Sequence, residues 1–199
     1  MSNLSQRSKY VLALSLAALL SPVAVRAAGE SDTASSQAKA SLIQPLSITR
    51  TSSSSLDFGI LIKNTLTAPV TLVLDPRLSQ SSSITSSNPA GVTPLSGDHD
   101  AQFNVTGEPG EVIQVALPSS ITLKRGAGGT AATEMTVNRF QADVFNAAGS
   151  SNLINDTTRQ FTMPTDGSAF LEVGGTLTVD PTDSFGDYTG TFNVTVSYV

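Results

Sequence analysis

Hydrophobic and polar residues alternate with a period of two along many short stretches of this chain. The alternation is clearest at the C-terminus, where one row holds Phe192, Val194, Val196 and Tyr198 and the other holds Asn193, Thr195 and Ser197. Strict alternation of β-branched and aromatic residues with polar ones is typical of a half-buried β-strand. The pattern therefore predicts a strand from residue 192 to the end of the chain, paired within a sheet.

Similar patterns predict a series of further strands. The predicted ranges are residues 42–48, 56–62, 70–74, 103–106, 112–117, 121–123, 135–140, 159–163 and 170–179. In the second range, Leu56, Phe58, Ile60 and Ile62 share one face. Within the last range, Gly174-Gly175 predicts a bulge or a close approach of another backbone.

Two long segments have weaker patterns. Residues 78–101 are rich in serine, and such a long connection predicts either a short strand near Ile84 or Val92 or a mobile surface loop. Residues 141–158 are predicted to be irregular, with one helical turn within residues 142–148.

The strand pattern predicts the fold class. Eight to ten short strands, frequent Gly and Pro turn signals and no alternation of helices with strands indicate an all-β protein. We expect a single antiparallel β-sandwich over residues 41–199, with little or no helix.

The N-terminus has the features of a secretory signal peptide. Arg7 and Lys9 precede an apolar run at residues 11–20, and small residues up to Ala27 offer a cleavage site. The run is short for a bilayer span. We therefore expect export of the chain, with residues 1–27 removed, residues 28–40 as a flexible polar tail and no membrane insertion afterwards. The predicted destination is the periplasm, the cell surface or the medium.

Charge and cysteine content exclude several classes of function. The full chain carries a formal net charge of -5, and the predicted signal peptide contains basic residues but no acidic ones. An acidic mature chain argues against nucleic acid as a partner. The chain has no cysteine, so disulfides, thiolate metal sites and a cysteine nucleophile are all excluded.

Several segments, in this order, resemble one bacterial secreted family. They are ASLIQPLSIT at residues 40–49, LDFG at 56–59, AQFNVTG at 101–107, VGGTLTV at 173–179 and the ending GDYTGTF at 186–192. These segments are similar to the family known as domain of unknown function 4402. The resemblance implies an exported β-sandwich and no established activity.

A looser resemblance concerns the C-terminal strand. Chaperone-usher pilins and spore-coat-U-like proteins end in a strand with a penultimate aromatic residue and a glycine about a dozen positions earlier, as Tyr198 and Gly186 do here. This resemblance implies an Ig-like or pilin-like sandwich that a neighbour's N-terminal extension completes by strand addition. The tail before Pro45 is the implied donor, although it has few large apolar residues. The alternative is an ordinary last strand whose Tyr198 packs in the core.

These patterns give one set of candidate residues for strand association or for closing the fold. The set is Leu42, Ile43, Leu46, Ile48, Gly186, Phe192, Val194, Val196 and Tyr198. The candidate partner is the protein itself, or another surface subunit, through β-strand pairing.

Candidates for chemistry are few. The single histidine, His99, lies between Asp98 and Asp100, and no Gly-x-Ser-x-Gly elbow surrounds any serine. Asp98 with Asp100, and Asp180 with Asp183 and Asp187, are oxygen-rich clusters. Calcium requires six to eight oxygen ligands, and neither cluster has the spacing of an EF-hand, which favours aspartates that form turns. We therefore predict no catalytic residue, no cofactor and no metal site.

Three hypotheses for function remain. The leading one is a non-enzymatic exported structural protein of the cell surface or an extracellular assembly, fimbria-like and associating through β-strands. The alternative is a secreted module that binds carbohydrate or another ligand, although the chain has no Trp and only three Tyr for stacking. A secreted hydrolase is the third, and the residue inventory disfavours it.

Overall fold

A computed structural model describes residues 32–51, 54–76, 84–127, 129–145, 151–154 and 159–199. The chain divides into two units, Met1–Ala40 and Ser41–Val199. Residues 32–40 of the first unit are exposed and have no regular secondary structure. The predicted signal peptide, residues 1–27, lies outside the described residues.

The second unit is built from β-strands, which confirms the predicted all-β fold class. Its only described helix is a short 3-10 turn, η2 (Ala131–Thr133). The strands are β1 (Ser47–Arg50), β2 (Asp57–Lys63), β3 (Val70–Leu74), β4 (Ile84–Ser86), β5 (Val92–His99), β6 (Ala101–Thr106), β7 (Val112–Ala116), β8 (Ser120–Lys124), β9 (Glu134–Phe145), β10 (Ser151–Ile154), β11 (Gln160–Thr162), β12 (Ser168–Val179) and β13 (Thr195–Tyr198).

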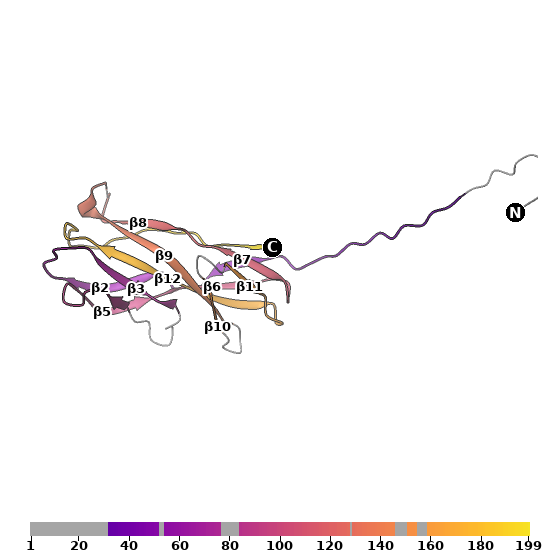
Figure 1. Ribbon diagram of the computed structural model, residues 1–199, viewed down its shortest axis with the longest axis horizontal. Coiled ribbons are helices and arrows are strands. Elements are labelled where there is room, and N and C mark those ends of the chain that lie inside the picture. Colours follow the sequence, from indigo (N-terminus) through magenta and orange to yellow (C-terminus); the bar gives the residue numbers. More distant parts are fainter. Residues whose placement is uncertain (1–31, 52–53, 77–83, 128, 146–150, 155–158) are drawn as a thin grey trace, which may run out of the picture. The chain divides into compact units, whose positions relative to one another are not determined.

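The strands form one large antiparallel sheet and two small ones (Figure 1). In the large sheet, β12 lies at the centre and pairs with β9 along one edge, and with β6 and then β3 along the other. β8 and β10 extend the sheet beyond β9, while β1 and β4 extend it beyond β6 and β3. The small sheets are β11–β7–β13 and β2–β5.

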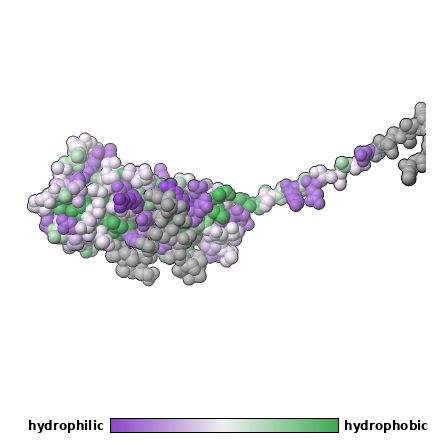
Figure 2. Space-filling model, viewed as in Figure 1, coloured by the Kyte–Doolittle hydropathy of each residue, from purple (hydrophilic) through white to green (hydrophobic). Residues whose placement is uncertain are grey.

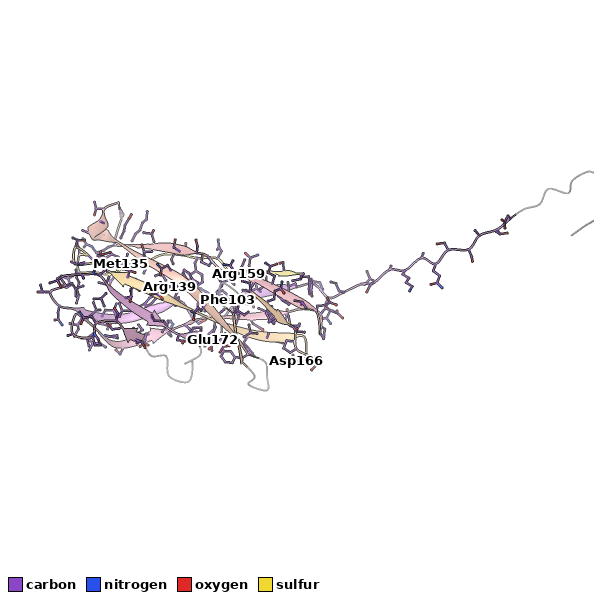
Figure 3. All side chains as sticks on the ribbon, in the orientation of Figure 1. Phe103, Met135, Arg139, Arg159, Asp166 and Glu172 are labelled. Atoms are coloured by element: carbon purple, nitrogen blue, oxygen red, sulfur yellow. The ribbon has the colours of Figure 1, made fainter. Side chains whose placement is uncertain are left out.

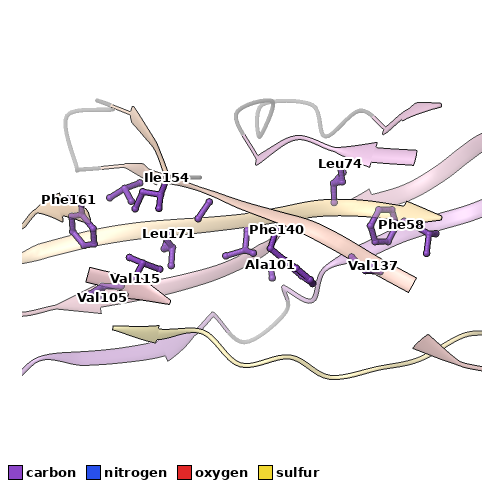
Figure 4. Close-up of a cluster of buried hydrophobic side chains, with 14 of the residues drawn as sticks. Phe58, Leu74, Ala101, Val105, Val115, Val137, Phe140, Ile154, Phe161 and Leu171 are labelled. Atoms are coloured by element: carbon purple, nitrogen blue, oxygen red, sulfur yellow. The ribbon is translucent and has the colours of Figure 1, made fainter. Parts of the chain in front are cut away.

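The core joins residues from all three sheets in one buried cluster. Figure 4 shows part of it, with Phe58 of β2, Val115 of β7 and Leu171 of β12 among the buried side chains. Each such side chain stabilises the fold by about 1.5–3 kcal/mol relative to its exposed state. The small sheets are therefore held against the large one mainly by apolar packing.

The predicted alternation in β2 is wrong beyond its first half. Phe58 is buried, but Ile60 is 63% exposed and Ile62 also faces solvent. Gly59 has a φ of +66°, and the pairing of β2 with β5 shifts register between Ile60 and Leu61. Because a bulge inserts an extra residue, it reverses which side chains face inward.

Two other predicted segments also differ from the structure. The helical turn expected within residues 142–148 is wrong, because β9 continues to Phe145 and its end pairs with β10; residues 146–148 lie outside the described part. The segment 78–101 contains two strands, β4 and β5, where one was expected. These additions raise the described strands to thirteen, above the predicted eight to ten.

The C-terminal strand is shorter than predicted. β13 begins at Thr195 and pairs with β7 through Tyr198, whereas residues 191–194 belong to no described strand. Burial nevertheless alternates as expected from residue 192 to residue 198. Phe192 packs against Phe103 and Phe140, with ring centroids 6.4 and 5.3 Å apart. The first half of the predicted strand is therefore held in place by side-chain packing and not by strand pairing.

Candidate functional site: a groove beside the C-terminal segment

A groove of about 620 Å³ lies between β2 and residues 184–190. The strand β2 forms one wall from Asp57 to Lys63, and the chain just before the last strand forms the other. Side chains of four further strands form the floor, and they are Val92 of β5, Leu123 of β8, Met135 of β9, and Leu177 and Val179 of β12. These five side chains are all apolar.

One wall of the groove, β2, belongs to a two-stranded sheet. Within the described residues, β2 pairs with one strand, β5. In the opposite wall, Thr189 exchanges two backbone hydrogen bonds with Lys124 of β8, of 2.7 and 3.0 Å. Unpaired strand edges bind other extended segments readily, because each residue offers a backbone donor or acceptor.

Lys63 ties the two walls together at one end of the groove. Its Nζ donates to the carbonyl oxygens of Pro181 and Asp183, at 2.8 and 2.7 Å. Lys63 is the last residue of β2, and these carbonyls lie just before the opposite wall. The ammonium group therefore fixes the separation of the walls at this point.

Tyr188 and Gly186 hold the wall at residues 184–190 in place. The hydroxyl of Tyr188 lies 2.7 Å from the carbonyl oxygen of Ser184 and 3.1 Å from that of Ala132, where it acts as the donor. Gly186 has a φ of +141°, and a Cβ there would lie 2.7 Å from Cδ of Arg125. Only glycine fits both the backbone angle and this close approach, so the predicted candidate Gly186 shapes the groove.

Tyr198 closes the fold at the other end of the C-terminal segment. Its hydroxyl accepts a hydrogen bond of 2.7 Å from the backbone N–H of Glu108 and donates one of 2.8 Å to the carbonyl oxygen of Gln44. The N–H of Gln44 in turn donates to Oε2 of Glu108 at 2.9 Å. These three hydrogen bonds, which we call the Tyr198 clamp, join the two ends of the unit to the turn between β6 and β7.

The other predicted candidates fall into two groups. Five are partly buried and pack against the core, and they are Leu46, Ile48, Phe192, Val194 and Val196. The other two are exposed: Leu42 by 98% and Ile43 by 50%. Sequence reasoning missed the β2 wall, although a glycine inside an alternating stretch is a signal of a bulge.

The aspartate clusters form no described metal site. Among the residues that the structure describes, no three His, Asp or Glu side chains are placed to hold a metal ion. Asp183 accepts a hydrogen bond of 2.7 Å from the backbone N–H of Asp180, which is a turn-forming contact. His99 lies 4.0 Å from the carboxylate of Asp57, and its Nδ1 has no hydrogen-bond partner in the described part of the chain.

Asp100 is the most perturbed of these carboxylates. It is 5% exposed, and its Oδ2 has no hydrogen-bond partner among the described groups. Burial raises the pKa of Asp100 above its usual value of 3.8, and a hydrogen bond with the Glu172 side chain offsets only part of this effect. The folded protein therefore holds the Asp100 proton more tightly than the unfolded chain does.

We expect Asp100→Asn to stabilise the protein at neutral pH. Because the pKa of Asp100 is higher in the folded protein than in the unfolded chain, Asp100 contributes most to folding stability below pH 3.8. This stability is lost as the pH rises through the pKa of the folded state. The variant should therefore be more stable than wild type at pH 7 by about 1 kcal/mol or more, because burying a carboxylate costs more than burying a neutral amide. The gain should disappear near pH 3.5 in urea unfolding followed by circular dichroism. Asp166→Asn, at an exposed carboxylate, is the control, and an equal gain in both variants would contradict this account.

Residues 46–198 match the family described as Domain of unknown function (DUF4402). The chain belongs to the DUF4402 family. The DUF4402 match begins one residue before β1 and ends on Tyr198, so it covers all the described strands, the groove and most of the Tyr198 clamp. No curated protein and no solved structure matches the chain.

The DUF4402 description assigns no activity. Figure 3 shows Met135 of the groove floor toward one end of the unit and Asp166, in the turn before β12, toward the other. Gly167, next to Asp166, lies close to the side chain of Gln44. The groove and the Tyr198 clamp therefore lie toward opposite ends. No helix in the described residues is long and apolar enough to cross a membrane.

Proposed function

We propose that this protein is a non-enzymatic exported structural protein of the cell surface or an extracellular assembly, fimbria-like, whose units associate by β-strand pairing. The observation that carries the proposal is the groove, which lies beside the edge strand β2 and has apolar side chains along its floor. A strand placed there could pair with β2, which has one described strand partner. Its apolar side chains would cover the floor, as in other cases of β-strand addition.

The exposure of β2 supports this proposal. Unpaired edges with exposed apolar residues promote aggregation, and soluble proteins usually protect them with charges, prolines or bulges. Ile60 lies on this edge strand and is largely exposed. A bound partner strand would cover both the edge and this side chain.

Ile60→Lys tests the proposal. Because Ile60 is already exposed and lines the groove, we expect the variant to fold normally but to self-associate at least tenfold more weakly. Sedimentation velocity over a range of concentrations would measure the change. The matched control is Leu95→Lys, on the paired strand β5, because Leu95 is 57% exposed and lies outside the groove.

The control should assemble as wild type does. Equal loss in both variants would indicate association through the outer face of the β2–β5 sheet, and no loss in Ile60→Lys would contradict the use of the groove.

One feature favours the alternative, a secreted module that binds carbohydrate or another ligand. Phe185 lines the groove and is 78% exposed, and exposed aromatic rings can stack on sugars. A glycan array distinguishes the two functions. Specific glycan binding by a monomeric protein, lost in Phe185→Ala, would support the module.

A further inference from the structure

The groove beside β2 has the size and the lining of a small-molecule site. We propose that it binds an amphiphile with an alkyl chain and a cationic amine head, with the chain over the floor and the head at the rim. This ligand goes beyond the proposed function, because a small molecule fills the groove without a second copy of the chain. A ligand there would also compete with a partner strand for the β2 wall, and this consequence rests on the proposed function.

The volume of the groove and the length of its wall favour a long ligand. The volume of about 620 Å³ lies within the range of roughly 300–1,000 Å³ that is usual for small-molecule sites. The β2 wall runs over seven residues, from Asp57 to Lys63. At the rise per residue of a strand this wall is about 20 Å long, which accommodates an extended alkyl chain.

Apolar side chains lie along both the floor and the rim of the groove. The five floor residues are apolar, and on the rim Ile60 is 63% exposed and Phe185 is 78% exposed. Figure 2 shows apolar residues between polar ones on the surface of the compact unit. An alkyl chain laid over the floor would remove apolar surface of both molecules from water. Each buried CH₂ group should therefore strengthen binding by about fourfold.

The charged residues of the lining favour a cationic head. Three of the described lining residues carry a charge, and they are Asp57, Lys63 and Asp187. The ammonium group of Lys63 donates to two backbone carbonyl oxygens at one end of the groove. Asp187 is exposed and lies on the same wall as the exposed ring of Phe185. A carboxylate near an aromatic ring attracts an amine or quaternary ammonium group, through opposite charge and the cation–π interaction.

Titration calorimetry with alkyltrimethylammonium ions below their micelle-forming concentration tests the class of ligand. The chain from residue 28 onward is used at concentrations where it is monomeric. We expect the affinity to rise about fourfold with each added CH₂ group from hexyl to decyl. The alkyl sulfate of the same chain length should bind about fivefold more weakly or less tightly still, because Asp57 and Asp187 repel its head. Equal affinity for the two heads would overturn the cationic class, and an affinity independent of chain length would overturn apolar binding.

Two pairs of matched variants locate the site. Ile60→Lys should weaken binding of the decyltrimethylammonium ion by about tenfold or more, because it places a charge where the alkyl chain must lie. Its control is Leu95→Lys, outside the groove. Asp187→Asn should weaken binding by about two- to fivefold, the usual effect of one exposed charge pair, and Asp166→Asn should leave it unchanged. Equal affinity in each variant and its control would overturn the placement in the groove.

Competition with assembly separates this inference from the proposed function. The decyltrimethylammonium ion should weaken self-association in sedimentation velocity, and decyl sulfate should have less effect. Wild-type protein that binds this ion but stays monomeric at the highest concentration overturns the proposed function and leaves the inference standing. Wild-type protein whose assembly depends on Ile60 but which binds no amphiphile overturns this inference alone.

Discussion

Gly174→Ala is expected to destabilise the unit by about 3 kcal/mol or more, the upper end of the cost of overpacking a core. Gly174 lies where β12 changes partner, because Val173 pairs with β6 and Gly175 pairs with β3. A Cβ at Gly174 would clash with the carbonyl oxygen of Leu74 and lie 2.8 Å from Cδ of Pro76. The Leu74 carbonyl cannot move without disturbing the pairing of β3 with β12.

Urea unfolding followed by circular dichroism measures this effect. Gly110→Ala is the matched control, since Gly110 has a φ of +81° and open space around the position of its Cβ. The control should lose only about 1 kcal/mol, from backbone strain alone. If both variants lost the same stability, the close approach at Gly174 would not be the cause.

Tyr198→Phe should cost about 2 kcal/mol of stability, although the ring and its packing are kept. The hydroxyl accepts from the N–H of Glu108 and donates to the carbonyl of Gln44, so its removal leaves a part-buried donor without a partner. The same change should free the start of the unit. Hydrogen exchange should therefore become faster at residues 44–48.

Tyr188→Phe is the control for the clamp. Its hydroxyl serves only as a donor to two carbonyl oxygens, and unsatisfied carbonyls are tolerated better than unsatisfied N–H groups. We expect it to lose about half as much stability as Tyr198→Phe and to leave residues 44–48 protected. Faster exchange there in the control would argue against a specific role of Tyr198.

The alternation of apolar and polar residues along short stretches of the chain was enough to predict the fold class and most of the strands. Residues 70–74 and 170–179 alternate apolar and polar side chains, and both form strands with the expected buried face. The register shift around Gly174-Gly175 could also be predicted from the sequence, because two adjacent glycines have no side chains to block the close approach of another backbone.

The groove could not be predicted, because it depends on contacts between distant parts of the chain. Gly59 turns Ile60 toward solvent, and only the pairing with β5 shows where the bulge lies. The partners of the Tyr198 hydroxyl are 90 and 154 residues away in sequence. A period-two pattern identifies which face of a strand is buried, but not which neighbour covers its edge.

Hydrogen exchange at the two groove walls tests the central claim most directly. Backbone amides of β2 and of residues 184–190 should exchange at least tenfold more slowly in assembled wild-type protein than in the Ile60→Lys monomer, because a partner strand would hydrogen-bond to β2 and cover the opposite wall. Amides of β3, which already pairs on both edges, should not change. Equal exchange of the walls in polymer and monomer would show that assembly leaves the groove empty, and would contradict the account.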